Sequence, residues 1–439
     1  MDSKALTKIQ SVALIAIIVI AAVGGGAAYV LLRGPGLSAE TLRIGVCGDL
    51  TMTGGKQTWQ GAVLAAEQIN AEGGILGRNL TIVAEDSDDE TTGDPAAVSK
   101  ALTKLITLDK ADYIITSVMG LGPAYTIQDV CAEHKKIVFS SRIGLDNLTL
   151  RVQDDYERYK YYFRVGGINA TSMGALMLDY VLTIANYTGF TKVATLFQEA
   201  PSSVIMASVL NASLPKYGLG VVHLGHLPVT VTDFTSYFAA IEESGAEILV
   251  PGLVGGQGLA FVKEWYERQS PVIVCGLLTM AQESSFWNLT QGQCETVSFS
   301  GYPAIAGYPL TDKTLPTREA FVERWGEVIT SSAVAAYDIV RFILPDAIKR
   351  AGTTETEAVI KALEKTDVET SAARHFTFTT AHDIMIPVRG ASGVDEDYIQ
   401  WFLFQWQDGN QVIVYPDGVR EEAGAIFKYP PWPGPWDTK

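Results

Sequence analysis

Arg142 is well placed to hold a charged ligand, because it directly follows a strand-like run of residues. It lies in the stretch IVFSSRIGL, residues 137 to 145, where β-branched and aromatic side chains give way to two serines. A guanidinium can bind a carboxylate through two charge-assisted hydrogen bonds, each contributing about 1.5 to 3 kcal/mol. The alternative is a structural ion pair with a nearby acid such as Asp146 or Asp155. A plain surface charge is the third role that the sequence leaves open.

Residues that could carry out catalysis do not form a recognised pattern. His223 and His226 are three positions apart in a strand-like segment, which directs them to opposite faces and argues against shared metal ligation. The chain contains no Gly-x-Ser-x-Gly, His-Glu-x-x-His or Walker motif. The acidic run EDSDDE, residues 85 to 90, lacks the ligand spacing of a calcium loop. We expect no enzymatic activity, no metal and no cofactor.

Strands and helices alternate regularly along most of the chain. LRIGVCG, residues 42 to 48, predicts a buried strand, TWQGAVLAAEQINAEGG a helix closed by glycines, and LTIVAED the next strand. The same rhythm restarts after YYFRVG, residues 161 to 166. Buried strands separated by helices predict an α/β fold with two doubly wound lobes, whose parallel sheets are joined by hinge crossovers. Asp408-Gly409 predicts a late hairpin.

The boundaries of these parts follow from changes in composition and pattern along the chain. We expect residues 1–11 as a cytoplasmic N-terminus, 12–32 as a transmembrane signal-anchor or signal peptide, 33–41 as a linker, 42–163 and 304–390 as the first lobe, 164–303 and 391–416 as the second lobe or a lobe-spanning hairpin, and 417–439 as an extended C-terminal tail.

The first residues resemble an export signal. The apolar run from Val12 to Leu32 is long enough to cross a bilayer, and Lys4 and Lys8 precede it. Two interpretations remain open, a retained anchor and a signal peptide cut after Ala28. We expect the protein at the cell surface, anchored by this helix with its binding domain outside, or secreted if the segment is cleaved.

Two further patterns fit an oxidising, extracytoplasmic compartment. Cys275 and Cys294 flank a loop between two strand-like runs, so we expect a disulfide between them. We expect Cys47 and Cys131 to be buried thiols, with a bridge between them as the alternative. Six Asn-x-Ser/Thr triplets predict surface glycosylation. Their asparagines are Asn79, Asn147, Asn169, Asn186, Asn211 and Asn288.

The charge balance argues against nucleic acid as a partner. The formal net charge is −16 at pH 7 and the pI is about 4.8. Such a chain repels a phosphate backbone and offers no basic stripe.

Three segments together resemble a known family. They are Gly61 with AVLAAEQINAEGGILGRNLTIVAED after it, the pair Asp94-Pro95, and AAYDIVRFILPDAIKRAG. These segments resemble the type I periplasmic-binding-fold substrate-binding proteins of ABC importers, in particular the branched-chain amino acid or amide-binding, leucine-binding-protein-like members. The resemblance spans about residues 42 to 416. It implies a monomeric clamp that closes on a small solute and delivers it to a membrane permease.

The resemblance also implies where the solute binds. In the first lobe it points to the loops that carry Gly120, Leu121 and Gly122, and Ser140, Ser141 and Arg142; in the second lobe it points to Gly256 and Gln257. The family's serines are missing from the first of these loops, its threonine is replaced by Gly144, and its acidic residue is absent from the second lobe. These departures disfavour a standard α-amino acid and leave an amino acid-like solute, an amide and an organic carboxylate open.

Four other residues are candidate contacts, each with a structural alternative. Trp59 could stack on the solute or pack on the first helix, and Tyr302 could contact the solute or only pack near a crossover. Gln198 and Glu199 follow a second-lobe strand and could offer polar contacts, or Glu199 could face solvent. The alternative to transport is a sensory ectodomain that signals through a membrane partner, since the same fold also serves receptors.

Overall fold

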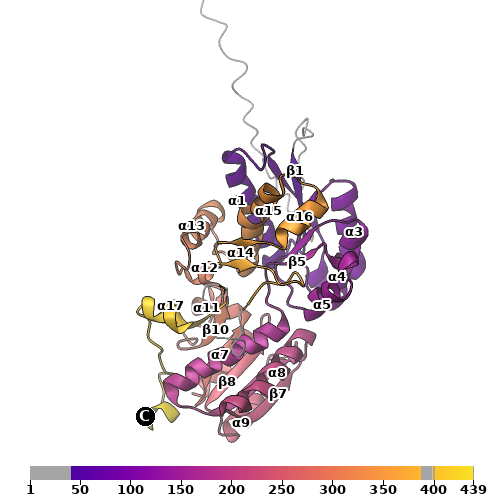
Figure 1. Ribbon diagram of the computed structural model, residues 1–439. Helices are drawn as coiled ribbons and strands as arrows, with labels where there is room; N and C mark the ends of the chain where they lie inside the picture. Colours follow the sequence, from indigo (N-terminus) through magenta and orange to yellow (C-terminus); the bar gives the residue numbers. More distant parts are fainter. Residues whose placement is uncertain (1–40, 387–397, 399–400, 439) are drawn as a thin grey trace, which may run out of the picture.

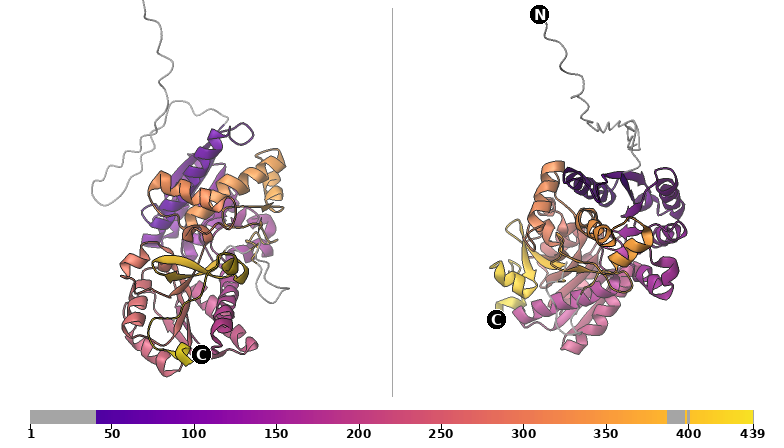
Figure 2. Two further views of the ribbon diagram at one scale, coloured as in Figure 1. Left: turned by 90° about the vertical axis from the view of Figure 1, so that its left-hand side faces the viewer. Right: turned by 45° about the horizontal axis from the view of Figure 1, so that its top comes forward.

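The computed structural model describes residues 41–386, 398 and 401–438, which form two α/β lobes with one large sheet each (Figure 1). The first lobe is the upper one in Figure 1, where α1, α3, α15 and α16 are labelled, and the second lobe lies below it around β7 and β8. Figure 2 shows the same two bodies from two further directions, with the chain passing between them in the middle.

The first lobe has a five-stranded parallel sheet in the order β2-β1-β3-β4-β5. Alternate residues of the central strand β1 face opposite sides. Ile44 and Val46 join the core under α1, whereas Cys47 joins a separate cluster under α3 and α4. This two-sided burial explains the nearly continuous apolar run. The strands are β1 (Leu42–Gly48), β2 (Leu80–Asp86), β3 (Tyr113–Thr116), β4 (Val138–Ser140) and β5 (Tyr162–Arg164).

Helices cover both faces of the first sheet. Gly61 lets α1 approach α14 closely, because a Cβ there would lie 2.4 Å from the carbonyl oxygen of Ala333. Asp94 caps α3, accepting a 2.9 Å hydrogen bond from the amide of Ala96. The helices are α1 (Thr53–Ala71), α2 (Asp89–Thr92), α3 (Pro95–Thr107), α4 (Leu121–Glu133), α5 (Asp146–Asp154), α6 (Tyr156–Tyr159), α13 (Thr314–Trp325), α14 (Ser331–Asp338), α15 (Leu344–Ala351) and α16 (Thr356–Leu363); a π-helical segment, Ile339–Ile343, joins α14 to α15. A short ribbon, β11 (Asp367–Val368) and β12 (Phe376–Thr377), follows them.

The second lobe has a seven-stranded sheet in the order β14-β13-β10-β9-β8-β6-β7. Five strands are parallel, and the predicted hairpin adds β13 and β14 antiparallel at one edge. Its turn residues Asp408 and Gly409 both have positive φ, which suits a tight two-residue turn. The strands are β6 (Lys192–Gln198), β7 (Gly220–Leu227), β8 (Ile248–Leu253), β9 (Ile273–Leu278), β10 (Ser298–Gly301), β13 (Phe402–Gln407) and β14 (Asn410–Tyr415).

The helices of the second lobe follow the same alternation. Asn169 caps α7, accepting a 2.7 Å hydrogen bond from the amide of Ser172. The helices are α7 (Ala170–Thr188), α8 (Pro201–Ser213), α9 (Thr235–Glu243), α10 (Gly258–Glu267), α11 (Phe286–Leu289), α12 (Pro303–Ala306) and α17 (Asp417–Glu422), with 3₁₀ turns at Leu214–Tyr217, Thr279–Gln282 and Pro435–Thr438.

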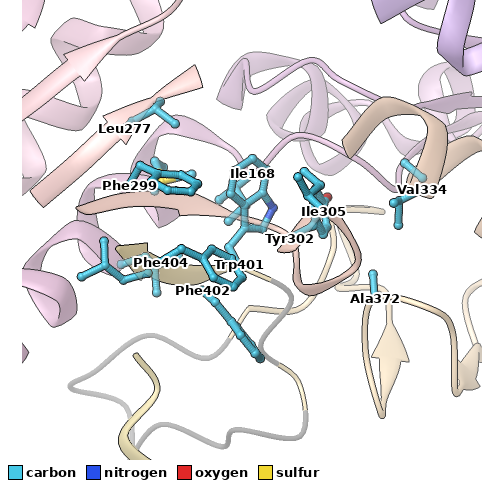
Figure 3. Close-up of a cluster of buried hydrophobic side chains, with 14 of the residues drawn as sticks. Ile168, Leu277, Phe299, Tyr302, Ile305, Val334, Ala372, Trp401, Phe402 and Phe404 are labelled. Carbon is cyan, nitrogen blue, oxygen red and sulfur yellow. The ribbon is translucent and has the colours of Figure 1, made fainter. Parts of the chain in front are cut away.

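An aromatic cluster lies where the chain leaves β10 and enters β13 (Figure 3). The rings of Tyr302 and Trp401 lie side by side, with centroids 4.6 Å apart. Phe299 and Phe404 pair across the antiparallel strands, with ring centroids 5.9 Å apart. Ile305 lies close to Tyr302 in Figure 3 and extends this buried cluster toward the first lobe. The junction between the lobes is therefore apolar and well packed.

The structure corrects the predicted disulfide. All four cysteines are buried free thiols in the described part of the chain. The parallel register places Ser298 beside Cys275, and Cys294 lies four residues earlier, before β10 begins. The predicted link between Cys275 and Cys294 is therefore wrong. Burial raises the pKa of both thiols to about 12, so neither is a ready thiolate.

The C-terminal tail is more regular than expected. Residues Asp417–Glu422 form α17, although the whole segment after 416 was expected to be extended. Pro416 lies just before the first turn, where a missing N–H does no harm, and Asp417 favours the helix N-terminus. The rest of the tail returns to the second lobe, where the Trp432 ring packs on Trp265 with centroids 4.6 Å apart.

Candidate ligand-binding cleft

A cleft of about 1230 Å³ is lined by residues of both lobes. Its walls are built by the segments that follow parallel strands, as expected for open α/β sheets. Seven of the twelve predicted contacts lie on these walls. They are Gly120, Leu121 and Gly122 after β3, Ser141 and Arg142 after β4, Gln198 at the end of β6, and Gly256 after β8.

Several helices begin at the wall of this cleft. Thr53 and Gly54 begin α1, Leu121 begins α4, Pro201 begins α8 and Ser331 begins α14, and all of these residues line the cleft. None of these four helices has a side-chain cap. Their first amides have no acceptor inside the helix and can donate to an anionic group. The described lining also holds four acidic residues, Asp89, Glu90, Glu283 and Glu327, and one cation, Arg142.

Arg142 forms an ion pair with Glu90, and both side chains are about one-quarter exposed on the cleft wall. The short helix α2 brings Glu90 into this position. Gly54 leaves the guanidinium its space, because a Cβ at Gly54 would lie 2.0 Å from the Nη1 atom of Arg142. The structural ion pair that the sequence predicted as one alternative thus exists. Its partner is Glu90 instead of Asp146, which accepts a hydrogen bond from Thr171.

Two buried polar groups hold the first-lobe loops in place. Asp89 accepts a 2.6 Å hydrogen bond from the amide of Met119 and another from the hydroxyl of Ser87, and burial raises its pKa. The Ser141 hydroxyl donates to the carbonyl of Thr116 at 2.9 Å. The Ser141 side chain therefore has a structural role, even though the residue lines the cleft.

In the second lobe, Gln198 fixes the loop after β8. Its side-chain amide donates to the carbonyl of Val254 at 3.1 Å and accepts from the amide of Val254 at 2.9 Å. It also donates to Oε1 of Gln257 at 3.0 Å. Gly255 is tied to the hydroxyl of Thr279 at 2.9 Å. These hydrogen bonds fix the loop that carries Gly256 at the edge of the cleft.

Five predicted contacts lie outside the cleft lining. Trp59 packs against Trp325, with ring centroids 5.5 Å apart, so the packing alternative holds for it. Tyr302 is buried in the junction cluster and Glu199 is exposed. Ser140 and Gln257 support the loops from behind, since Ser140 accepts from the amide of Ile143 at 3.3 Å.

Sequence reasoning missed several lining residues. Met173, Met206 and Trp401 give the cleft apolar surface, and Ser203 adds a hydroxyl at the start of α8. The methionines have the helical spacing of core residues, and Trp401 lies beside an antiparallel hairpin that strand-end reasoning does not include. Ser203 could have been found, because it belongs to the segment directly after a strand.

The predicted glycosylation sites differ in their surroundings. Asn169 is engaged as the cap of α7, and its amide group also donates to Asp383 at 3.0 Å. The side chains of Asn169 and Asn211 are partly exposed, and those of Asn79, Asn147, Asn186 and Asn288 are exposed. Glycosylation at these six positions stays a prediction.

Comparisons with known proteins agree with this architecture. A family model described as periplasmic binding protein matches residues 41–397. The Leu/Ile/Val-binding protein homolog 3 of Brucella melitensis is 23% identical over 375 residues, covering 84% of this chain and 93% of the relative. A putative branched-chain amino acid ABC transporter structure from Silicibacter pomeroyi has a TM-score of 0.78 at 19% identity, covering 89% of this chain and all of that one. A solute-binding protein from R. palustris in complex with benzoate has a TM-score of 0.65 at 17% identity, with 85% and 95% coverage.

The chain therefore belongs to the periplasmic binding protein family. The predicted two-lobed fold and family are confirmed. Because the family consists of binding proteins, the prediction that the chain is not an enzyme is also confirmed.

The predicted localisation is wrong. Placement at the cell surface, or secretion, does not agree with a family of periplasmic proteins. The span proposed for residues 12–32 lies outside the described residues, and within the described ones no helix is long and apolar enough to cross a bilayer.

Proposed function

We propose that this protein captures a small carboxylate-bearing solute between its lobes and delivers it to the permease of an ABC importer. The observation that carries the proposal is the cleft itself, which both lobes line and at which uncapped helix N-termini of both lobes lie. Such a site offers free backbone donors in a space between two lobes, and a clamp of two lobes can close on the solute by hinge motion.

We infer the chemical class of the solute from the lining. Met173, Met206, Leu277, Ile305 and Trp401 offer apolar surface for an aliphatic or aromatic body. The Brucella melitensis relative is named for leucine, isoleucine and valine, and the R. palustris structure holds benzoate. All of these compounds join a carboxylate to an apolar body. An amino acid-like or aromatic carboxylate therefore fits the cleft better than a neutral amide does.

Polar residues of both lobes would contact the solute. Arg142, paired with Glu90, supplies a cation to the first-lobe wall, and Gly120 and Gly122 leave the start of α4 accessible. Gln198 and Gly256 border the cleft from the second lobe. Delivery to a permease is supported by the ABC transporter context of the similar structures.

The test is a thermal-shift and calorimetric screen of the full-length protein against leucine, benzoate and the neutral counterpart benzamide. A ligand that binds only the folded state raises the melting temperature by mass action. We expect leucine or benzoate to raise it and benzamide to have a smaller effect. The proposal would be contradicted if benzamide raised the melting temperature and neither leucine nor benzoate did.

A blocking variant shows whether the cleft is the binding site. Gly256→Trp places a large ring at an exposed position where a Cβ meets no atom within 4 Å, so it fills the cleft without forcing the backbone apart. We expect it to abolish the ligand-induced shift. Glu199→Trp is the matched control, because Glu199 is also exposed and is not part of the cleft lining.

A further inference from the structure

The N-terminus of α8 forms part of the second-lobe wall of the cleft. Ala200, Pro201, Ser202 and Ser203 all line it. The chain enters the helix from an extended residue, Ala200, with φ −122° and ψ 148°, which provides no side-chain cap. Pro201 has no N–H, so the first free amides belong to Ser202 and Ser203, and first-turn amides have no acceptor inside the helix. Two backbone donors are thus left at the end of a 13-residue helix.

Ser203 provides the second, independent observation. The residue is only 1% exposed, yet its Oγ atom has no hydrogen-bond partner among the described residues. A buried hydroxyl without a partner lowers stability, and buried polar groups in folded proteins are nearly always paired. A hydroxyl left unpaired beside free amides, in a cleft, is therefore poised for a group that arrives with the ligand.

The first-lobe wall also has uncapped helix starts, but among the described residues none of them carries a buried hydroxyl without a partner. At the start of α14 the hydroxyls of Thr330 and Ser332 pair with each other at 3.0 Å, and Thr53 at the start of α1 is exposed. The start of α4 consists of Gly120, Leu121, Gly122 and Pro123, none of which carries a hydroxyl. The Ser141 hydroxyl is used by the carbonyl of Thr116. Arg142 is the one cation among the described lining residues, and Glu90 already neutralises it.

We infer that the N-terminus of α8 is the carboxylate subsite of the cleft, with the amides of Ser202 and Ser203 and the Ser203 hydroxyl as donors. This inference rests on the proposed function and assigns the anionic end of the solute to the second lobe. The helix dipole adds to the three donors, because negative charge is stabilised near a helix N-terminus. The apolar body of the solute then extends along Met206 and Met173 toward the first lobe.

The test compares Ser203→Ala with Ser213→Ala in the full-length protein. Ser213 lies at the other end of the same helix, where its hydroxyl donates to the carbonyl of Val209 at 2.8 Å. Calorimetric titration with leucine and benzoate measures affinity, and melting without ligand measures stability. We expect Ser203→Ala to weaken carboxylate binding by about tenfold to hundredfold, the effect of losing a hydrogen bond to a charged group. Ligand-free melting should be unchanged or higher, because the removed hydroxyl had no partner.

The outcomes separate this inference from the proposed function. If the parent and Ser213→Ala bind neither leucine nor benzoate, both the function and the subsite are overturned. If they bind and Ser203→Ala binds equally well, only the subsite is overturned. A third outcome also overturns the subsite. In it, Ser203→Ala weakens binding of benzamide as much as binding of the carboxylates and also lowers the ligand-free melting temperature. That pattern would show that Ser203 has a structural role.

Discussion

Arg142 and Glu90 form an ion pair on the first-lobe wall of the cleft, joining the loop after β4 to α2. The pair leaves Arg142 without a free charge to offer a solute, although the helix N-termini around it favour an anion. Arg142 and Glu90 therefore affect binding through the net charge of the cleft wall. Substituting each residue alone and both together separates their contributions.

We expect Arg142→Ala to weaken benzoate binding by about tenfold, because Glu90 then leaves an unpaired negative charge in the cleft that holds the anion. The double variant Arg142→Ala with Glu90→Gln should return affinity to within about threefold of the parent, since both charges are gone. Titration calorimetry on the parent, the two single variants Arg142→Ala and Glu90→Gln, and the double variant measures this cycle. A double variant as weak as Arg142→Ala would instead show that the guanidinium holds the carboxylate directly.

A buried ion pair between Arg164 and Asp383 supports the same wall from behind. The Nε atom of Arg164 lies 2.8 Å from Oδ1 of Asp383, and Arg164 is fully buried. The guanidinium also donates to the carbonyls of Ile143 and Leu145, which follow Arg142 in the chain. This arrangement anchors the loop that carries Arg142.

Asp383→Asn is therefore expected to lower the free energy of unfolding by about 3 kcal/mol or more, because a buried cation loses its counter-charge. It should also weaken solute binding as the loop loosens. Urea denaturation measures the stability change. Asp367→Asn is the control, since Asp367 faces His375 in a pair that is about half exposed, and it should change stability by less than about 1 kcal/mol. Equal effects of the two substitutions would contradict the structural role of Asp383.

Asp338 should make stability depend on pH. Burial raises its pKa from an ordinary value of 3.8 to about 6, although its carboxylate accepts hydrogen bonds from Ser371. Between these values the folded chain binds more protons than the unfolded chain, so this residue lowers stability as pH rises from about 4 to about 6. Above that range the loss is complete.

Asp338→Asn removes this titration and keeps an acceptor for Ser371. The variant should match the parent near pH 4 and exceed it at pH 8 by an amount on the order of 3 kcal/mol. Chemical denaturation at several pH values gives the difference between variant and parent. A difference that stays constant over this range would show that Asp338 does not titrate as expected.

The C-terminal tail should contribute to stability through Trp432. Its indole N–H donates to the carbonyl of Ser270 at 3.1 Å, and its ring packs on Trp265. Trp432→Ala should reduce the free energy of unfolding by about 3 kcal/mol and leave solute binding unchanged, because the residue does not line the cleft. Tyr429→Ala, at a position that is 39% exposed, should have a much smaller effect. A similar loss in both variants would argue against a specific anchor.

The sequence by itself determined the repeating strands and helices, the two lobes and the loops that line the cleft. It could do so because apolar periodicity, glycine helix ends and caps such as Asp94 act over a few neighbouring residues. Strand ends then gave Gly120, Arg142 and Gln198 as wall residues, since parallel strands bring such loops to one edge.

The tertiary structure decided everything that depends on partners distant in sequence. Glu90 reaches Arg142 across 52 positions, and Asp383 pairs with Arg164 although the two residues are far apart in the sequence. The register of β9 and β10 separated Cys275 from Cys294, which proximity in sequence had suggested as a pair. Ser203 became notable only when burial left its hydroxyl without a partner. Pairing and burial are set by how the lobes pack in three dimensions, and a linear pattern does not contain that information.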